Sequence, residues 1–479
     1  MKTLNHTLLL FTVIIIEGYV VLASELLAIK QTVPYVGSGT DTMSIIIAAV
    51  LMPLAFGYQN GGRFKPKKIF GQFITVRKKL ILNIIIASSI LLFGMSYDPL
   101  RYIFIEALPA IGIEERLSQV SVYSLIFIVI PVYLLGQTVP LVSNFFSKEK
   151  LSEITGKMLC FSTIGSFMGA VFSTLVLMTT LGVHHTTSLN FILLAILVIL
   201  LSKKKASIAV FYMCLIAFTA VTLNSDRVMF KHRIKKNNQY HTIAAGKIDG
   251  DRRMYIDGNF SSRKTKYGRK HDYVEFVERV AIMDNLDPEQ PPIDILSIGA
   301  GAFTFGEGDI HNNYTYVDID KDLVEVAEKY ILQHPLEENK KFIAKPARAF
   351  LHTSTEKYDI IFLDTYQGGI SIPEHMVTQE YFASVKKHLK DGGILLANVI
   401  MSPNFNSPLA RNIDNTVRSV FPHVSRHIIN ENYYLWSEKA TLKANTIYIY
   451  RHEDNYDEGH IYTDNKNTVF YDKPRSLRD

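Results

Sequence analysis

Cysteine and tryptophan are nearly absent from this chain. Two cysteines and one tryptophan occur among 479 residues, and Cys160 and Cys214 both lie inside apolar runs. Two such residues provide neither a disulfide framework nor a cysteine-rich zinc site. The first apolar run also lacks the form of a removable signal peptide. Glu17 and Glu25 interrupt it and no small-residue cleavage site follows, so we expect it to be retained.

Charge is scarce before residue 224 and ordinary after it. The chain is 48% hydrophobic, with a mean hydropathy of +0.12, which is high for a soluble protein. The excess comes from long apolar runs, most of them near the ~20 residues that cross a bilayer. The sequence therefore predicts a membrane-spanning half followed by a soluble part. The expected spans are residues 8–28, 43–61, 80–96, 120–143, 158–180, 187–201 and 206–223.

Lysine and arginine in short loops predict how such spans are oriented. The loop at 63–79 and the later loops "SKEK" and "SKKK" are basic, so these loops and the N-terminus are expected in the cytoplasm. Seven spans would then place the C-terminal part outside, whereas the basic run at 227–236 favours the inside. We predict a multi-pass cell-membrane protein with a cytoplasmic C-terminal part, and the extracytoplasmic alternative stays open.

Two features of the apolar half have competing interpretations. Glu17 and Glu25 are eight residues apart and share about one helix face. They either serve a substrate or proton path, or, as we prefer, Glu25 reaches the interface while Glu17 hydrogen-bonds a neighbouring helix. Gly165, Gly169 and Ala170, in "TIGSFMGA", are better explained as a close helix-packing face than as a site.

The C-terminal part begins with a short β region. Residues 238–260 alternate apolar and polar side chains around the turn "KIDGDR", which predicts a β-hairpin. A helix is expected from about Tyr273 to Asn285, and the turn "DPEQPP" ends this unit. Strands and helices then alternate, which predicts an α/β domain with a largely parallel, doubly wound sheet.

Ligands bind at the carboxyl ends of the strands in such a sheet. Gly299, Ala300 and Gly301 follow the first strand, where bare backbone can approach a nucleotide, although Phe303 and Phe305 are unusual there. Asp318 ends the second strand and is placed to accept hydrogen bonds from a ribose.

Two further acids follow strands of this domain. Asp320 is expected to cap the next helix. Asp364, after "YDIIFL", can accept a proton from an attacking amine, with Tyr366 lining the same pocket. The alternative is that Asp364 is a turn or cap residue.

These motifs, with "GYQNGGR", "GQTVPLV" and "STIGSFMGAVFSTLVLMTTLG" in the apolar half, resemble the spermidine synthase (polyamine aminopropyltransferase) family, in its membrane-fused branch. The resemblance implies a multi-span α-helical domain at 1–225 and a small β region on the substrate side at 226–290. It also implies a Rossmann-like domain of the S-adenosylmethionine-methyltransferase type at 291–455, followed by a polar tail at 456–479.

The resemblance also implies the chemistry, which is polyamine biosynthesis. An aminopropyl group passes from decarboxylated S-adenosylmethionine to an amine such as putrescine, with Asp364 as the catalytic proton acceptor and no metal. The expected partners are a lipid bilayer, a small-molecule amine or polyamine and a second copy of the chain in a homodimer, with no nucleic acid. The expected donor contacts are Gly299, Gly301, Asp318 and Ala347, and the expected substrate contacts are Tyr240, His241, Tyr273, Glu275 and Tyr366.

The chain departs from the family pattern at four positions. Ala302 and Pro346 stand where donor-binding aspartates are usual, Gln367 replaces a second acid, and His241 replaces a glutamine. Each lost carboxylate removes a contact of ~1.5–3 kcal/mol. Two other hypotheses therefore remain open. The domain is either a noncatalytic nucleoside or polyamine sensor coupled to a transporter-like bundle, or an S-adenosylmethionine-dependent transferase with another acceptor.

Overall fold

The chain forms two compact units. A computed structural model describes residues 2–69, 72–146, 151–203, 207–283, 289–366, 372–403, 405–429, 444–450, 462–465 and 469. Gln367 and the predicted helix end at Asn285 lie outside these ranges. The N-terminal unit contains residues 1–36, 41–232 and 237–239, and the C-terminal unit contains 37–40, 233–236 and 240–479.

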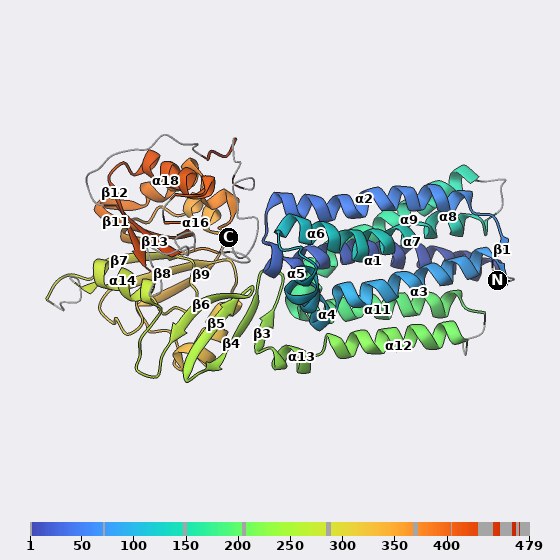
Figure 1. The fold of residues 1–479 in the computed structure, drawn as a ribbon, viewed down its shortest axis with the longest axis horizontal. Coiled ribbons are helices and arrows are strands. Elements are labelled where there is room, and N and C mark those ends of the chain that lie inside the picture. Colours follow the sequence, from blue (N-terminus) through green and yellow to red (C-terminus); the bar gives the residue numbers. More distant parts are fainter. Residues whose placement is uncertain are drawn as a thin grey trace. The chain divides into compact units, whose positions relative to one another are not determined.

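The N-terminal unit is a helical bundle (Figure 1). Among the described residues, seven helices are long and apolar enough to cross a membrane, and each predicted span lies mostly or wholly within one of them. They are α1 (Lys2–Val36), α2 (Thr40–Arg63), α3 (Val76–Met95), the α6 to α8 stretch (Arg116–Ser143), α9 with α10 (Leu151–Thr180), α11 (Gly182–Leu201) and α12 (Ile208–Leu223).

Short elements connect these helices. The strands β1 (Lys67–Ile69) and β2 (Gln72–Ile74) pair antiparallel in the basic loop after α2. The segments α4 (Tyr97–Tyr102), a π-helical turn (Ile103–Ala107) and α5 (Leu108–Ala110) precede α6, and α13 (Asp226–Lys231) follows α12.

Glycines allow α1 and α9 to pack with their backbones in contact. A side-chain carbon at Gly165 or Gly169 would collide with the carbonyl oxygens of Ile15 and Tyr19, respectively. The predicted small-residue packing face is therefore confirmed. Glu17 and Glu25 are both buried within the bundle. The preferred prediction that Glu25 reaches the membrane interface is therefore wrong, because both side chains face the interior of the bundle.

The C-terminal unit begins with a four-stranded sheet rather than a hairpin alone. Its strands are β3 (Ile234–Asn237), β4 (Thr242–Ile248), β5 (Asp251–Ile256) and β6 (Asn259–Lys264), in that order. The predicted hairpin corresponds to β4 and β5, which pair from Ile243↔Ile256 to Ile248↔Asp251. Helix α14 (Asp272–Ala281) follows and buries an apolar face that includes Tyr273 and Val277.

The main sheet has seven strands in the order β12-β13-β11-β10-β7-β8-β9. The five strands from β9 to β11 are parallel, as predicted, whereas β13 is antiparallel to both of its neighbours. Their bounds are β7 (Asp294–Ile298), β8 (Asn313–Asp318), β9 (Lys340–Ala344), β10 (Tyr358–Leu363), β11 (Leu389–Met401), β12 (Val424–Ile429) and β13 (Ala444–Tyr450).

Helices cover both faces of this sheet, as expected for a doubly wound domain. The helices α16 (Ala347–Thr353), α17 (Gln379–Lys387) and α18 (Pro408–Val420) contribute to one buried apolar cluster. On the other side, α14 and α15 (Asp322–Ala327, continued by a π-helical turn at Glu328–Leu332) contribute to a second cluster.

The strand order reverses between β7 and β10, because the chain runs outward through β8 and β9 and then returns to β10. This reversal is the topological switch point, outside which such folds bind ligands at the carboxyl ends of the strands. Gly299 follows β7 and Asp364 follows β10, so the two predicted motifs meet at this point.

Candidate functional site

The glycine loop after β7 packs directly against the end of β10. Gly299 has φ +95°, and a side-chain carbon there would collide with the carbonyl oxygen of Asp364. The two phenylalanines of the loop are buried, Phe303 against Tyr316 and Phe305 against Phe362, with ring centroids 5.1 and 4.8 Å apart. The aromatic residues therefore anchor the loop in the core and leave its glycines at the strand ends.

Side chains from three elements accept hydrogen bonds from the loop amides. Ala300 N donates to Asp318 Oδ2 at 3.0 Å, and Ala302 N donates to Ser262 Oγ of β6 at 3.0 Å. Gly306 N donates to Glu278 Oε1 of α14 at 2.7 Å. The small sheet and α14 thus hold the loop in one conformation.

Asp318 keeps capacity to bind a ligand. Its Oδ1 accepts a hydrogen bond from Asp320 N at 3.2 Å, in addition to the Ala300 bond on Oδ2. Each carboxylate oxygen has two lone pairs, so each can still accept one bond from a ribose hydroxyl. Burial raises the pKa of the Asp318 carboxyl, while His241 and the two backbone bonds oppose the rise. Asp320 was predicted to cap the next helix, but the N-cap position of α15 is Lys321; Asp320 Oδ1 instead accepts from Asp322 N, two residues on, at 3.0 Å.

Asp364 is held by one hydrogen bond on each carboxylate oxygen. Tyr273 OH of α14 donates to Oδ2 at 2.8 Å, and Asn398 Nδ2 of β11 donates to Oδ1 at 2.9 Å. Burial raises the pKa of the Asp364 carboxyl, and the bonds from Asn398 and Tyr273 partly offset that rise. The arrangement fixes the orientation of a carboxylate whose proton affinity is higher than that of an exposed aspartate, as suits a general base.

Tyr366 has a positioning role in this arrangement. Its hydroxyl donates to the Asn398 carbonyl oxygen at 2.9 Å and accepts a bond from Ile400 N at 2.8 Å. These bonds connect the segment after β10 to β11. The backbone of β11 therefore engages the Tyr366 hydroxyl, while the place of Tyr366 in a substrate pocket stays a prediction.

The remaining predicted substrate residues are more dispersed. His241 is buried, with Nδ1 3.3 Å from Asp320 Oδ2, so it lies on the Asp318 side of the site. Tyr240 precedes it and is half-buried. Glu275 accepts bonds from Lys270 N at 2.8 Å and from Arg269 Nη2 at 3.4 Å. No described contact joins Glu275 to Asp364.

The two residues after β9 that stand at the expected donor positions, Pro346 and Ala347, carry no charge. Pro346 is exposed and precedes α16 without a side-chain capping bond, and Ala347 is half-buried in the first turn of that helix. This position provides backbone and apolar surface only.

Three residues that hold the site were not predicted. Asn398 lies in "LLANVI", where one polar residue interrupts an apolar strand, and that interruption was a usable signal. Ser262 and Glu278 carry no comparable signal. Their roles depend on how β6 and α14 pack on the loop, which local sequence does not specify.

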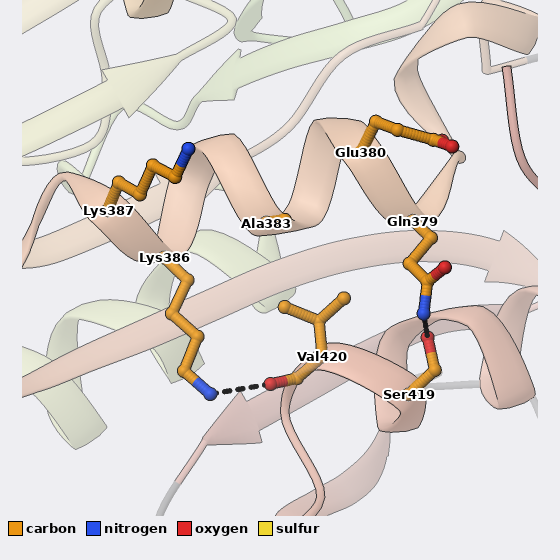
Figure 2. Close-up of a pocket in the computed structure, with 7 residues that line it drawn as sticks. All are labelled: Gln379, Glu380, Ala383, Lys386, Lys387, Ser419 and Val420. Atoms are coloured by element: carbon orange, nitrogen blue, oxygen red, sulfur yellow. Dashed lines mark hydrogen bonds between the residues drawn. The ribbon is translucent and has the colours of Figure 1, made fainter.

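The surface of this unit also has a pocket of about 600 Å³ between α17 and the end of α18. Figure 2 shows Lys386 Nζ donating to the Val420 carbonyl oxygen at 2.7 Å and Gln379 Nε2 donating to Ser419 Oγ at 3.2 Å. The pocket contains none of the residues around Asp364.

Comparison with known proteins agrees with this geometry. Residues 280–437 match the family model of the spermine/spermidine synthase domain. The C-terminal unit is a member of the spermidine synthase family. The matched range includes Gly299, Asp318 and Asp364, so the glycine loop and both acids lie inside the spermidine synthase domain.

Individual relatives match the spermidine synthase domain over part of their length. A probable polyamine aminopropyl transferase of Bifidobacterium longum is 33% identical over 109 residues, covering 23% of this chain and 24% of the relative. A polyamine aminopropyltransferase of Vibrio vulnificus is 28% identical over 157 residues, covering 32% and 50%. The chain thus spans half or less of the length of these relatives. The crystal structure of a probable spermidine synthase from Corynebacterium glutamicum is 20% identical, with a TM-score of 0.38, over 46% of this chain and 79% of that one.

Proposed function

We propose that the C-terminal unit is an aminopropyltransferase-like enzyme with Asp364 as the proton acceptor. The observation that carries the proposal is the position of this carboxylate. The backbone carbonyl of Asp364 packs against Gly299 at the switch point of the sheet, and Tyr273 and Asn398 each donate a hydrogen bond to one oxygen of its carboxylate. Such a group is held in place for proton transfer next to a nucleotide-binding loop.

A nucleoside-bearing sulfonium donor, decarboxylated S-adenosylmethionine, fits the residues beside Asp364. The free lone pairs of Asp318 can accept both ribose hydroxyls. Gly299 and Gly301 present no side chain where the donor approaches the backbone. The donor supplies an electrophilic aminopropyl carbon next to its sulfonium.

The transfer is a displacement. The lone pair of the acceptor amine forms a nitrogen–carbon bond to the aminopropyl carbon, and the carbon–sulfur bond breaks with its electron pair moving to sulfur. Methylthioadenosine leaves as a neutral thioether. The proton lost by the amine passes to Asp364 and then to water, which restores the carboxylate. Tyr273 and Asn398 keep the carboxylate aimed at the reacting amine.

One observation favours a second candidate, a nucleoside sensor without transfer activity. Ala302 is fully buried and its amide is bonded to Ser262, so its side chain does not face a ligand. Pro346 also provides no carboxylate. Two missing charge-assisted contacts of ~1.5–3 kcal/mol each weaken binding of a cationic donor by ~10²–10⁴-fold.

We propose further that the seven apolar helices span a membrane. In the N-terminal unit, consecutive helices alternate in direction (Figure 1). The connections after α2, α8 and α11 are basic, whereas residues 37–39 and 96–115 at the opposite end include a single basic residue, Arg101. The chain leaves α12 at this second end. The seven-helix count therefore supports an extracytoplasmic C-terminal unit, while the cytoplasmic placement stays a prediction from the basic run at 227–236.

Activity reporters fused after Asp479 distinguish the two orientations. One suitable reporter is an enzyme that works only outside the cytoplasm. Activity of this reporter in the fusion would place the C-terminal unit outside, where a cytoplasmic donor is absent, and would favour the sensor.

The enzymatic proposal is tested by methylthioadenosine release from the full chain in detergent, with decarboxylated S-adenosylmethionine and putrescine as substrates. We expect Asp364→Asn to lower the rate at least ~100-fold, as for a positioned general base. Asp391→Asn is the matched control, because Asp391 lies exposed on β11. Equal rates for Asp364→Asn and the wild type would show that Asp364 is only a turn residue.

A further inference from the structure

Two adjacent histidines and an aspartate converge at one end of the N-terminal unit. His184 and His185 lie in the first turn of α11, and Asp226 begins α13. The Nε2 atoms of both imidazoles are 3.1 Å from the same oxygen, Asp226 Oδ1. Within the described ranges, these residues form the one group of three or more His, Cys, Asp or Glu side chains that could hold a metal ion.

The convergence of the two imidazoles is unusual for neighbouring residues. Consecutive side chains on an α-helix point about 100° apart, so two adjacent histidines normally diverge. Here the ring centroids are only 4.1 Å apart, and both rings turn toward α13. A single hydrogen bond would be enough to connect α11 to α13, and it leaves the second imidazole unexplained.

The backbone makes room for the more buried ring. Gly182 has φ +84°, and a side-chain carbon there would lie 2.9 Å from His184 Cε1 and 3.0 Å from its Nδ1. The His184 ring occupies the space that any other residue at position 182 would fill. Gly182 therefore has a packing reason as well as a conformational one.

The distances from the Asp226 oxygen to the two imidazole nitrogens suit a tetrahedral ion. An ion with bonds of ~2.0–2.1 Å places its ligands ~3.3 Å apart, close to the two 3.1 Å separations. The His184 side chain is 12% exposed and the Asp226 side chain is 84% exposed. One side of the group is thus enclosed and the other is open to water, which can supply the fourth ligand.

We infer that His184, His185 and Asp226 form a binding site for a divalent cation of the zinc class. Two imidazoles with one carboxylate suit Zn²⁺ and neighbouring first-row ions better than Mg²⁺ or Ca²⁺, which prefer oxygen ligands. The bound ion connects the start of α11 to α13, the short helix that follows the last apolar helix. The site is independent of the reaction proposed for the C-terminal unit, for which no metal is implied.

The helix ends make the carboxylate essential. His184 and His185 lie at the N-terminus of α11, where the helix dipole disfavours a cation. Asp226 must neutralise that field for an ion to bind. Removal of this charge should therefore weaken binding strongly even though both imidazoles remain.

The test is a Zn²⁺ titration of the full chain in detergent, purified through a tag without histidines. We expect one ion per chain, and visible absorption of the Co²⁺-loaded protein characteristic of tetrahedral coordination. Asp226→Asn and His185→Gln should each weaken binding at least ~10–100-fold, since loss of a direct ligand costs no less than loss of a supporting residue.

His232→Gln is the matched control. His232 lies at the end of α13 and pairs with Asp98, which Lys231 also contacts at 3.2 Å. This variant should bind Zn²⁺ like the wild type. His184→Gln is a further test that depends on correct folding, whereas Asp226→Asn changes an exposed side chain and keeps the fold.

Two results would overturn the inference. One is that the wild-type chain binds no more Zn²⁺ than the double variant His185→Gln/Asp226→Asn. This result would show that hydrogen bonds alone hold the three side chains together. The other is a loss of binding in His232→Gln equal to the loss in Asp226→Asn.

Discussion

Gly299→Ala probes the contact between the glycine loop and the end of β10. A side-chain carbon at position 299 would lie well inside the ~3.5 Å contact distance of the Asp364 carbonyl oxygen. That oxygen belongs to the backbone directly after β10, where Asp364 N donates to Ile298 O at 2.8 Å, so it cannot move aside alone. The φ of +95° is also outside the regions that a residue with a side chain prefers.

The expected loss of stability follows from three terms. Positive φ costs ~1–2 kcal/mol, and forced displacement of packed backbone costs ~1–3 kcal/mol. Alanine regains ~0.4–1 kcal/mol by restricting the unfolded chain. The net loss is ~2–4 kcal/mol, which corresponds to a ~30- to 700-fold increase in the population of the open state.

Hydrogen–deuterium exchange of the full chain in detergent measures this change, because core strands exchange through the largest openings. Peptides covering β7 and β10 should lose protection by that factor. Gly392→Ala is the control. Its φ is +80°, and an added carbon would meet nothing within 4 Å, so the loss should stay below ~10-fold. Equal protection in the two variants would refute the proposed packing of the loop on β10.

Two predictions concern the Asp364 carboxyl. Tyr273→Phe removes a hydrogen bond of ~1.5–3 kcal/mol to the carboxylate, which should raise the pKa of Asp364 further. The acid limb of the pH–rate profile should then move to higher pH by ~1–2 pH units. An unchanged acid limb would mean that Asp364 is not the titrating base. Burial raises the pKa of the Asp364 carboxyl in the folded chain above its value of ~3.9 in the unfolded chain. Protonated Asp364 therefore contributes its full share of folding stability below pH ~3.9, and this share is lost as the pH rises through the pKa in the folded chain. Asp364→Asn should therefore gain thermal stability relative to the wild type as the pH increases through that window, and a constant difference would contradict this.

Local pattern was sufficient to predict the strands that build the site. β7 and β10 are short, mostly apolar runs, and β8 is rich in aromatic and β-branched residues. Each strand leads to a glycine or an acid, and residues at the ends of parallel strands meet at one edge. Gly299, Asp318 and Asp364 could therefore be placed without knowledge of the packing. The antiparallel strand β13 was not predicted, because its pairing with β11 depends on contacts between distant parts of the chain.

The residues that control the acids required tertiary structure. Asn398 and Tyr273 come from β11 and α14, and their bonds to Asp364 depend on register and helix placement that no local periodicity specifies. Burial of Ala302 under Ser262 has the same origin. A one-residue shift in β6 would turn Ser262 to the other face of its sheet.

Calorimetric titration of the full chain with decarboxylated S-adenosylmethionine tests the central claim most directly, with methylthioadenosine and S-adenosylmethionine as comparison ligands. If the C-terminal unit uses its switch point as proposed, decarboxylated S-adenosylmethionine and methylthioadenosine bind, and Asp318→Asn weakens both more than ~10-fold by removing a charge-assisted contact to the ribose. Unchanged binding in Asp318→Asn, or no binding of either ligand by the wild type, would contradict the proposal that this loop holds a nucleoside-bearing donor.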